Sequence, residues 1–239
     1  MSVIDWRKEN SVAVVEMCNG SNRMNLAFTQ RMNQCFDEVL ADGDIQAMIL
    51  TSTDEKNFSQ GVDVEWIGSK LQAKENQAVI SFMHGMNDIF KRLLLFPVPV
   101  VAAINGHAYG NGAILSCACD FRFMRKDRGF FCFPEVDVSI PFLPGMIGFV
   151  RKAIPEYQFN QMLLSGQRMT AADLAAANVI VKACDRETLM TDVLAYAGSF
   201  VKKRGIFQEL KKRMHKELVR IIDEEDPEYI DALNLFVAD

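Results

Sequence analysis

The stretch at residues 98–135 constrains the fold of this chain more than any other part. Its first segment, the apolar run VPVVAAI at 98–104, predicts a fully buried strand because it is short and rich in β-branched residues. The segment GHAYGNG at 106–112 follows, with three glycines that let the backbone turn sharply. Residues 113–119 then predict a short buried helix, and residues 130–133 an aromatic strand. The stretch is therefore expected to form a strand, a glycine turn, a helix and a second strand.

Two features of this stretch suit chemistry. A helix that opens directly after a glycine turn presents unpaired N–H groups, which hold an anion or a developing oxyanion. Glu135 follows Phe133 and Pro134, and a carboxylate among apolar residues has a raised pKa that suits a general base. The glycines lack the G-x-G-x-x-G spacing of a dinucleotide site, and no P-loop motif occurs. On this segment alone, an ordinary turn stays open as the alternative.

The composition excludes several functional classes. With 239 residues, of which 49% are hydrophobic and 24% charged, the chain has the make-up of a globular protein with one core. A net charge of −5 argues against a nucleic-acid binder, and no apolar run approaches the roughly 20 residues that span a membrane. The cysteines form no C-x-x-C and the histidines no ligand pair, so we expect reduced thiols and no metal. The first residues lack the basic and apolar regions of a signal peptide, so we expect a cytoplasmic protein.

Four sequence blocks occur together in a fixed order: FSQGVD at 58–63, AINGHAYGNG at 103–112, CDFR at 119–122 and FPEV at 133–136. In order and spacing they resemble the crotonase (enoyl-CoA hydratase/isomerase) superfamily, and the resemblance covers nearly the whole chain. It implies an α/β, ClpP-like spiral of β-β-α units over residues 1–184, followed by a C-terminal helical region over 185–239 that builds trimers. The implied assembly is a homotrimer or a dimer of trimers.

The resemblance also implies roles for individual residues. Glu135 would be the catalytic base and acid, and the backbone N–H groups of Val62 and Asn111 would form an oxyanion hole. The residues implied to lie against the substrate and its CoA are Arg23, Met24, Leu26, Ser59, Gly61, Asp63, Gly110 and Ile114. A plainer interpretation, in which Asn25 and Asp63 simply cap the helices that follow them, is compatible with these roles. The implied partner is an acyl-CoA thioester, and no cofactor is implied beyond the CoA of the substrate.

One position departs from the hydratase pattern of the family. Hydratases carry a second catalytic glutamate where this chain has Ile114, which cannot activate a water. A single glutamate suffices to move a proton from C2 to C4 of a 3-enoyl-CoA, and an apolar neighbour raises its pKa. We therefore expect an isomerase that forms 2-trans-enoyl-CoA. The alternatives are a hydratase, another crotonase acyl-CoA reaction, and a protein that binds acyl-CoA without catalysis.

Further expectations concern local structure. Residues 64–77 are expected to form a mobile segment over the acyl pocket, and the prolines on either side of Phe142 imply an apolar wall beside the carboxylate. Residues 125–129 predict a hairpin turn, residues 179–181 a strand and residues 207–225 one amphipathic helix. Asp120 and Arg122 are expected to pair with each other, and His107 to be structural. The cations expected on a solvated face are Lys202, Lys203, Arg204, Lys211, Lys212 and Arg213.

Overall fold

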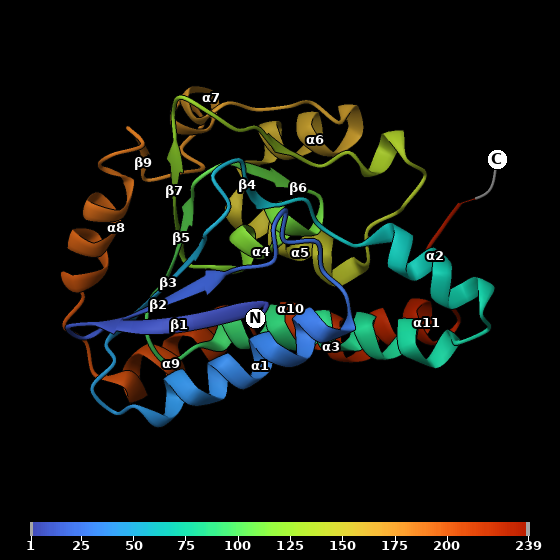
Figure 1. Ribbon diagram of the computed structural model, residues 1–239, viewed down its shortest axis with the longest axis horizontal. Coiled ribbons are helices and arrows are strands. Elements are labelled where there is room, and N and C mark those ends of the chain that lie inside the picture. The colour runs from blue at the N-terminus through green and yellow to red at the C-terminus, as the bar shows by residue number, and fades with distance from the viewer. Residues whose placement is uncertain (1, 238–239) are drawn as a thin grey trace.

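Two β-sheets form the centre of the molecule, seen in a computed structural model (Figure 1). The structure describes residues 2–237; Met1, at the start of the N-terminal segment considered above, Ala238 and Asp239 lie outside the described residues. The larger sheet has the order β1-β2-β3-β5-β7-β9 and consists of β1 (Ile4–Glu9), β2 (Val12–Met17), β3 (Ala47–Ser52), β5 (Val100–Ile104), β7 (Phe121–Arg125) and β9 (Lys182–Cys184). The smaller sheet has the order β4-β6-β8 and consists of β4 (Asn57–Ser59), β6 (His107–Tyr109) and β8 (Phe131–Cys132).

The chain alternates between these two sheets. β3, β5 and β7 lie in the larger sheet, and each is followed by a strand of the smaller sheet and then by helical structure. The helical segments are α2 (Val64–Gln72) and α3 (Asn76–Leu95), then α4 (Asn111–Ala118), then the 3₁₀ turn η1 (Glu135–Asp137). Only β1 and β2 pair in antiparallel fashion, and the other neighbours are parallel. This is the repeated β-β-α arrangement that the sequence predicts.

Both faces of the larger sheet are buried, because successive side chains of a strand point to opposite faces. In β3, Met48 and Leu50 join the main core, to which α1 (Leu26–Ala41) and α3 contribute. Ala47 and Ile49 join a second cluster that contains Leu189, Val193 and Ala197 of α8 (Leu189–Gly198). Figure 1 shows α8 on one side of the sheet and α1 and α3 on the other. Burial on both faces explains why β3 and β5 are continuous apolar runs.

The remaining helices, with the exception of α9, contribute side chains to the main core. They are α5 (Pro144–Ala153), α6 (Glu156–Ser165), α7 (Ala171–Ala176), α9 (Arg204–Met214), α10 (Lys216–Glu224) and α11 (Asp226–Asp231). Ile222 of α10 and Ile230 of α11 belong to the same hydrophobic cluster as the strands of the larger sheet. Within residues 2–237, no helix combines the length and the apolar character that crossing a membrane requires.

Helix starts follow the local capping signals of the sequence. Asn25 Oδ1 accepts a hydrogen bond from the Phe28 N–H and starts α1, and Asp63 Oδ1 accepts one from Trp66 and starts α2. Thr170 and Asp173 form a capping box at α7. Most of residues 64–77, which are predicted to form a mobile segment, are helical, because α2 and the start of α3 occupy this range.

Two predictions of strand geometry are wrong. Residues 125–129 form no hairpin, because β7 and β8 belong to different sheets and this segment carries the chain from one sheet to the other. The last strand is β9 at Lys182–Cys184 rather than 179–181; Val179 and Ile180 instead bury their side chains in the main core. The helix predicted over 207–225 is divided into α9 and α10 at His215.

The expected pairing of Asp120 with Arg122 is also wrong. Asp120 Oδ2 accepts hydrogen bonds from Lys211 Nζ at 2.9 Å and from the Val100 N–H at 2.8 Å. Arg122 instead donates to the backbone carbonyls of Ser116, Cys119 and Val179. Lys211 is therefore buried rather than solvated, with its side chain 4% exposed, and it fastens α9 to the start of β5. Arg204 donates to the carbonyls of Leu40, in the last turn of α1, and of Asp42 and Ile45, just beyond that helix.

Lys211→Met should lower the free energy of unfolding by about 3 kcal/mol, because it leaves the largely buried Asp120 carboxylate with the Val100 N–H as its remaining partner and no positive charge. Urea unfolding of both proteins measures this difference. Lys212→Met, at the exposed neighbouring position, is the matched control and should change stability little. Equal effects of the two substitutions would contradict a structural role for the buried pair.

Candidate active site

A cavity of about 600 Å³ lies among α2, α3, η1, α5 and the C-terminal segment. Most of its walls are apolar: Val64, Ile67 and Leu71 come from α2, and Phe142, Leu143 and Met146 from the segment that opens α5. Among the described residues that line it, the only charged side chains are those of Arg23 and Glu135. A largely apolar cavity of this size with a few polar groups is typical of a small-molecule site.

Two glycine turns meet at the wall of this cavity. Gly61 has a φ of 77°, and a Cβ atom there would lie 2.7 Å from the Tyr109 carbonyl oxygen and 3.2 Å from the Asn111 nitrogen. Gly110 has a φ of 51° and immediately precedes α4. A side chain at Gly61 would therefore force the two backbones apart, and both turns need conformations that favour glycine. Their contact brings the Val62 and Asn111 backbones next to each other.

The hydrogen-bond pattern leaves both of these amides without an acceptor. Met24 N–H donates to the Gly61 carbonyl at 2.8 Å and Asp63 N–H donates to the Met24 carbonyl at 2.9 Å, so this parallel bridge does not use the N–H of Val62. Asn111 is the first residue of α4, where amides have no partner within the helix. In the part of the chain that the structure describes, neither N–H has a hydrogen-bond acceptor. Two adjacent free donors can bind an oxyanion.

Glu135 lies against the same turn. A Cβ atom placed on Gly110 would lie 2.9 Å from Glu135 Oε1, so the carboxyl group packs against the Gly110 backbone. Burial raises the pKa of Glu135 to about 7, and a backbone hydrogen bond only partly offsets this effect. Its buried Oε2 has no hydrogen-bond partner among residues 2–237. A carboxyl group with this pKa exchanges protons readily near neutral pH, as a general base must.

The residues predicted for the site divide into two groups. Arg23, Gly61, Val62, Gly110, Asn111 and Glu135 line the cavity, and Met24, Leu26, Ser59, Asp63 and Ile114 do not. Two residues of the second group, Ser59 and Asp63, instead form hydrogen bonds that hold the Gly61 turn and the start of α2. Ser59 Oγ, fully buried, donates to the Asn22 carbonyl and accepts from the Gly61 N–H, while Asp63 caps α2. Ile114, predicted to lie against the substrate as an apolar neighbour of Glu135, is fully buried in the main core and does not line the cavity.

Sequence reasoning missed several residues of the cavity wall. Gln60 and Tyr109 adjoin the glycines of the two turns, and their positions beside residues already singled out were the available signal. Leu235 and Phe236 also line the cavity, although they follow Glu135 by about a hundred residues. Nothing local in the sequence indicates that contact. His107 does not line the cavity; its Nδ1 accepts a hydrogen bond from the Phe130 N–H.

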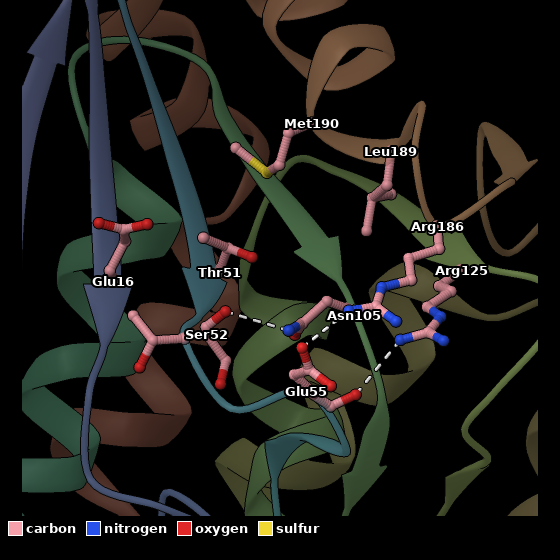
Figure 2. A pocket seen from close by; sticks show the side chains of 10 residues that line it. Glu16, Thr51, Ser52, Glu55, Asn105, Arg125, Arg186, Leu189 and Met190 are labelled. Atoms are coloured by element: carbon pink, nitrogen blue, oxygen red, sulfur yellow. Dashed lines mark hydrogen bonds and ion pairs between the residues drawn. The ribbon is translucent and has the colours of Figure 1, made fainter.

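A second, smaller cavity of about 220 Å³ lies apart from Glu135, at the carboxyl ends of β2, β3 and β7 (Figure 2). Figure 2 shows Arg125 and Arg186 converging beside Asn105 and Glu55. These charges already have partners: Arg186 pairs with Glu55 at 2.7 Å, and Arg125 binds both carboxylate oxygens of Asp127. Nowhere in residues 2–237 do three or more His, Cys, Asp or Glu side chains gather as metal ligands would. The first cavity is therefore the candidate active site.

Comparison with known proteins supports the fold expected from the sequence. A sequence profile described as enoyl-CoA hydratase/isomerase matches residues 7–231, which is nearly the whole chain. The chain belongs to the enoyl-CoA hydratase/isomerase family. The α/β crotonase fold expected from the sequence is thereby confirmed, and the protein is an enzyme of this family.

Individual members of the enoyl-CoA hydratase/isomerase family carry different reaction names. Enoyl-CoA delta isomerase 3 of Arabidopsis thaliana is 29% identical over 188 residues, which cover 74% of this chain and 76% of that protein. The short-chain-enoyl-CoA hydratase of Clostridium acetobutylicum is 28% identical over 212 residues, or 86% and 78% of the two chains. The apo structure of an enoyl-CoA isomerase from Mycobacterium tuberculosis superposes with a TM-score of 0.86 at 22% identity, covering 97% of this chain and 98% of that one. That structure shows the shared fold, and the residues of the site must distinguish the two reactions.

The raised pKa of Glu135 predicts that this residue destabilises the folded protein at high pH. The carboxyl ionises near its ordinary pKa of 4.5 in the unfolded chain and near 7 in the folded protein. Between these values the folded state binds more protons, so stability falls as pH rises. Glu135→Gln removes this effect, so the variant should be more stable than the native protein by about 3 kcal/mol near pH 8.5 and by about 1 kcal/mol near pH 5.5.

Urea unfolding of the two proteins at both pH values measures this difference. Asp137→Asn is the matched control, because Asp137 lies on the same 3₁₀ turn but is exposed. A stability difference that does not change with pH would contradict the raised pKa.

Proposed function

We propose that this protein is an enoyl-CoA isomerase that converts a 3-enoyl-CoA to the 2-trans-enoyl-CoA. Glu135 removes a proton from C2 of the acyl group, and negative charge develops on the thioester oxygen. The N–H groups of Val62 and Asn111 donate to that oxygen where the charge develops. Each such donor typically lowers the barrier by roughly 3 kcal/mol. Glu135 then delivers the proton to C4, and the double bond ends between C2 and C3.

The observation that carries this proposal is the single buried carboxyl group beside two free amides. Among the described residues that line the cavity, Glu135 is the one carboxylate. Hydration in this family uses a water held between two carboxylates, whereas a proton shift within one substrate needs a single group that accepts and returns the proton. Ile114, at the position of the second glutamate, is apolar and fully buried. The reaction transfers only a proton, so we propose that it needs no metal and no cofactor beyond the CoA of the substrate.

The first test is turnover of purified protein with trans-3-hexenoyl-CoA, followed by the ultraviolet absorbance of the conjugated product. We expect isomerisation without hydration of crotonyl-CoA. The rate should rise with pH and level off above a pKa near 7, because only the ionised Glu135 can act as the base. Glu135→Gln should lower the rate by about a thousandfold, and the exposed Asp137→Asn should leave it nearly unchanged.

Other outcomes of this assay would lead to different conclusions. Hydration of crotonyl-CoA without isomerisation would overturn the proposal in favour of a hydratase, the reaction named for the Clostridium acetobutylicum relative. An unchanged rate in Glu135→Gln would exclude Glu135 as the base. No turnover with either substrate, together with saturable acyl-CoA binding in a calorimeter, would indicate a different crotonase reaction or a protein that only binds.

We further propose that the active form is a homotrimer or a dimer of trimers, with α9 in the subunit contact. Ile206, Leu210 and Met214 repeat at intervals of four residues on α9, and they are 66%, 54% and 65% exposed. An apolar stripe at helical spacing is typical of a helix face that packs against another surface. The membership of the family supports the same assembly.

Leu210→Glu should dissociate this assembly, because it places a charge in the middle of the apolar stripe. Light scattering coupled to gel filtration measures the mass of the particle. The matched control is Lys212→Glu, which changes the charge of the same helix at an exposed position outside the stripe. A native protein that elutes as a monomer, or a Leu210→Glu protein of unchanged mass, would contradict the proposal.

A further inference from the structure

The packing of the protein does not explain why residue 68 is a glycine. It lies in the middle of α2, where a glycine is less favourable than alanine by about 1 kcal/mol. Its φ is not positive, and a Cβ atom there would have no neighbour within 4 Å. Gly85 and Gly148, also inside helices, are required by close contacts: a Cβ on Gly85 would lie 2.8 Å from Thr29 Oγ1, and one on Gly148 would meet the Leu218 side chain. Gly198 and Gly205 have open space as well, but they lie at the ends of α8 and α9, where a glycine costs less, and neither lines the cavity. At Gly68 the space is empty and opens onto the active-site cavity.

The cavity beside Gly68 is apolar and larger than a short acyl group needs. Its volume of about 600 Å³ corresponds to on the order of twenty water molecules. Beyond the turns that carry Val62, Asn111 and Glu135, its walls are side chains such as Ile67, Leu71 and Met83. The thioester end of the substrate takes the part of this volume beside Arg23, Val62 and Asn111, and the acyl chain takes the apolar part along α2. An apolar wall offers no hydrogen bonds to a polar substituent, so it selects a hydrocarbon chain.

The C-terminal segment supplies another part of the wall. Leu235 and Phe236 line the cavity, and the Val237 N–H donates a hydrogen bond of 3.0 Å to the Ser139 carbonyl. This bond holds the segment against the stretch that leads from η1 to α5. Leu235 is 7% exposed, whereas Phe236 is 45% exposed and has apolar surface left to contact a ligand. Figure 1 shows this segment next to α2.

We infer that Gly68 and Phe236 set the acyl-chain length of the substrate, and that this substrate is a fatty acyl-CoA longer than hexenoyl-CoA. The inference rests on the proposed function for the orientation of the substrate, with the thioester at Val62, Asn111 and Glu135. The hydrocarbon chain then extends along α2 past Gly68 towards Phe236. The missing side chain at Gly68 keeps that path open, and the Phe236 ring covers the chain.

Binding of saturated acyl-CoA esters tests this inference without any turnover. Calorimetric dissociation constants of butanoyl-CoA and dodecanoyl-CoA are compared for the native protein, Gly68→Leu and Phe236→Ala. Gly68→Leu should weaken dodecanoyl-CoA by about tenfold, as expected if roughly two methylene groups lose their apolar contact, and should change butanoyl-CoA less than about twofold. Phe236→Ala should likewise weaken the binding of dodecanoyl-CoA more than that of butanoyl-CoA.

Ser69→Leu is the matched control, because it adds the same side chain to an exposed neighbouring position of α2 outside the cavity wall. It should change neither constant. Gly68→Leu should fold at least as stably as the native protein, since it replaces a helical glycine without a clash. Val237→Ala keeps the backbone bond to Ser139 and serves as the control for Phe236→Ala.

The outcomes separate this inference from the proposed function. Equal weakening of both esters by Gly68→Leu, or native binding of dodecanoyl-CoA no tighter than that of butanoyl-CoA, would overturn the inference and leave the isomerase proposal standing. Chain-length-selective effects in a protein without isomerase turnover would support the acyl path and overturn the proposed reaction alone. No binding of either ester would overturn both.

Discussion

The close approach of two backbones, at Gly61 and at Gly110–Asn111, is the contact on which the site depends. Gly61 can lie against the Tyr109 carbonyl only because it has no Cβ atom. One turn belongs to the unit of β3 and β4, and the other to the unit of β5 and β6. The smaller sheet pairs β4 with β6, so the register of that sheet brings the turns together. The repeated β-β-α architecture thus places two free amides from different repeats next to each other.

The same turn places the Glu135 carboxyl group, the proposed base, in surroundings that oppose its ionisation. Glu135 Oε1 packs against Gly110, and the surrounding apolar residues raise the pKa of the carboxyl group. A solvated glutamate would be a weaker base with an ordinary pKa, and a fully neutral one could not accept a proton. A pKa near 7 lies between these limits, and it is obtained at the expense of stability whenever the group is ionised. The burial that makes Glu135 useful is therefore the burial that destabilises the fold.

The sequence predicts features that depend on neighbouring residues better than features that depend on residues far apart in the chain. Strand β5 and the caps Asn25 and Asp63 follow from neighbouring residues, and all were predicted. Lys211 looked solvated because its partner Asp120 lies 91 positions earlier in the chain. The segment at 125–129 looked like a hairpin because the sequence does not show that the chain changes sheets there. The contribution of Leu235 and Phe236 to the cavity was equally invisible, since only the packing of the C-terminal helices brings them there.

Helix α2 can contain a central glycine because contacts with the rest of the protein hold it in place. A helix of nine residues with a central glycine would be marginal in isolation. In the protein, Asp63 caps it, Ile67 is buried, and the Trp66 ring packs edge-on against Phe82 with centroids 5.6 Å apart. Asp63 also donates its N–H to the Met24 carbonyl in the bridge that leaves Val62 free. The residue that starts α2 is therefore bonded into the turn that carries Val62, the proposed oxyanion donor. A change that shifts α2 to fit another chain would also move that donor, whereas a change of side-chain volume at Gly68 leaves the backbone of the turn in place.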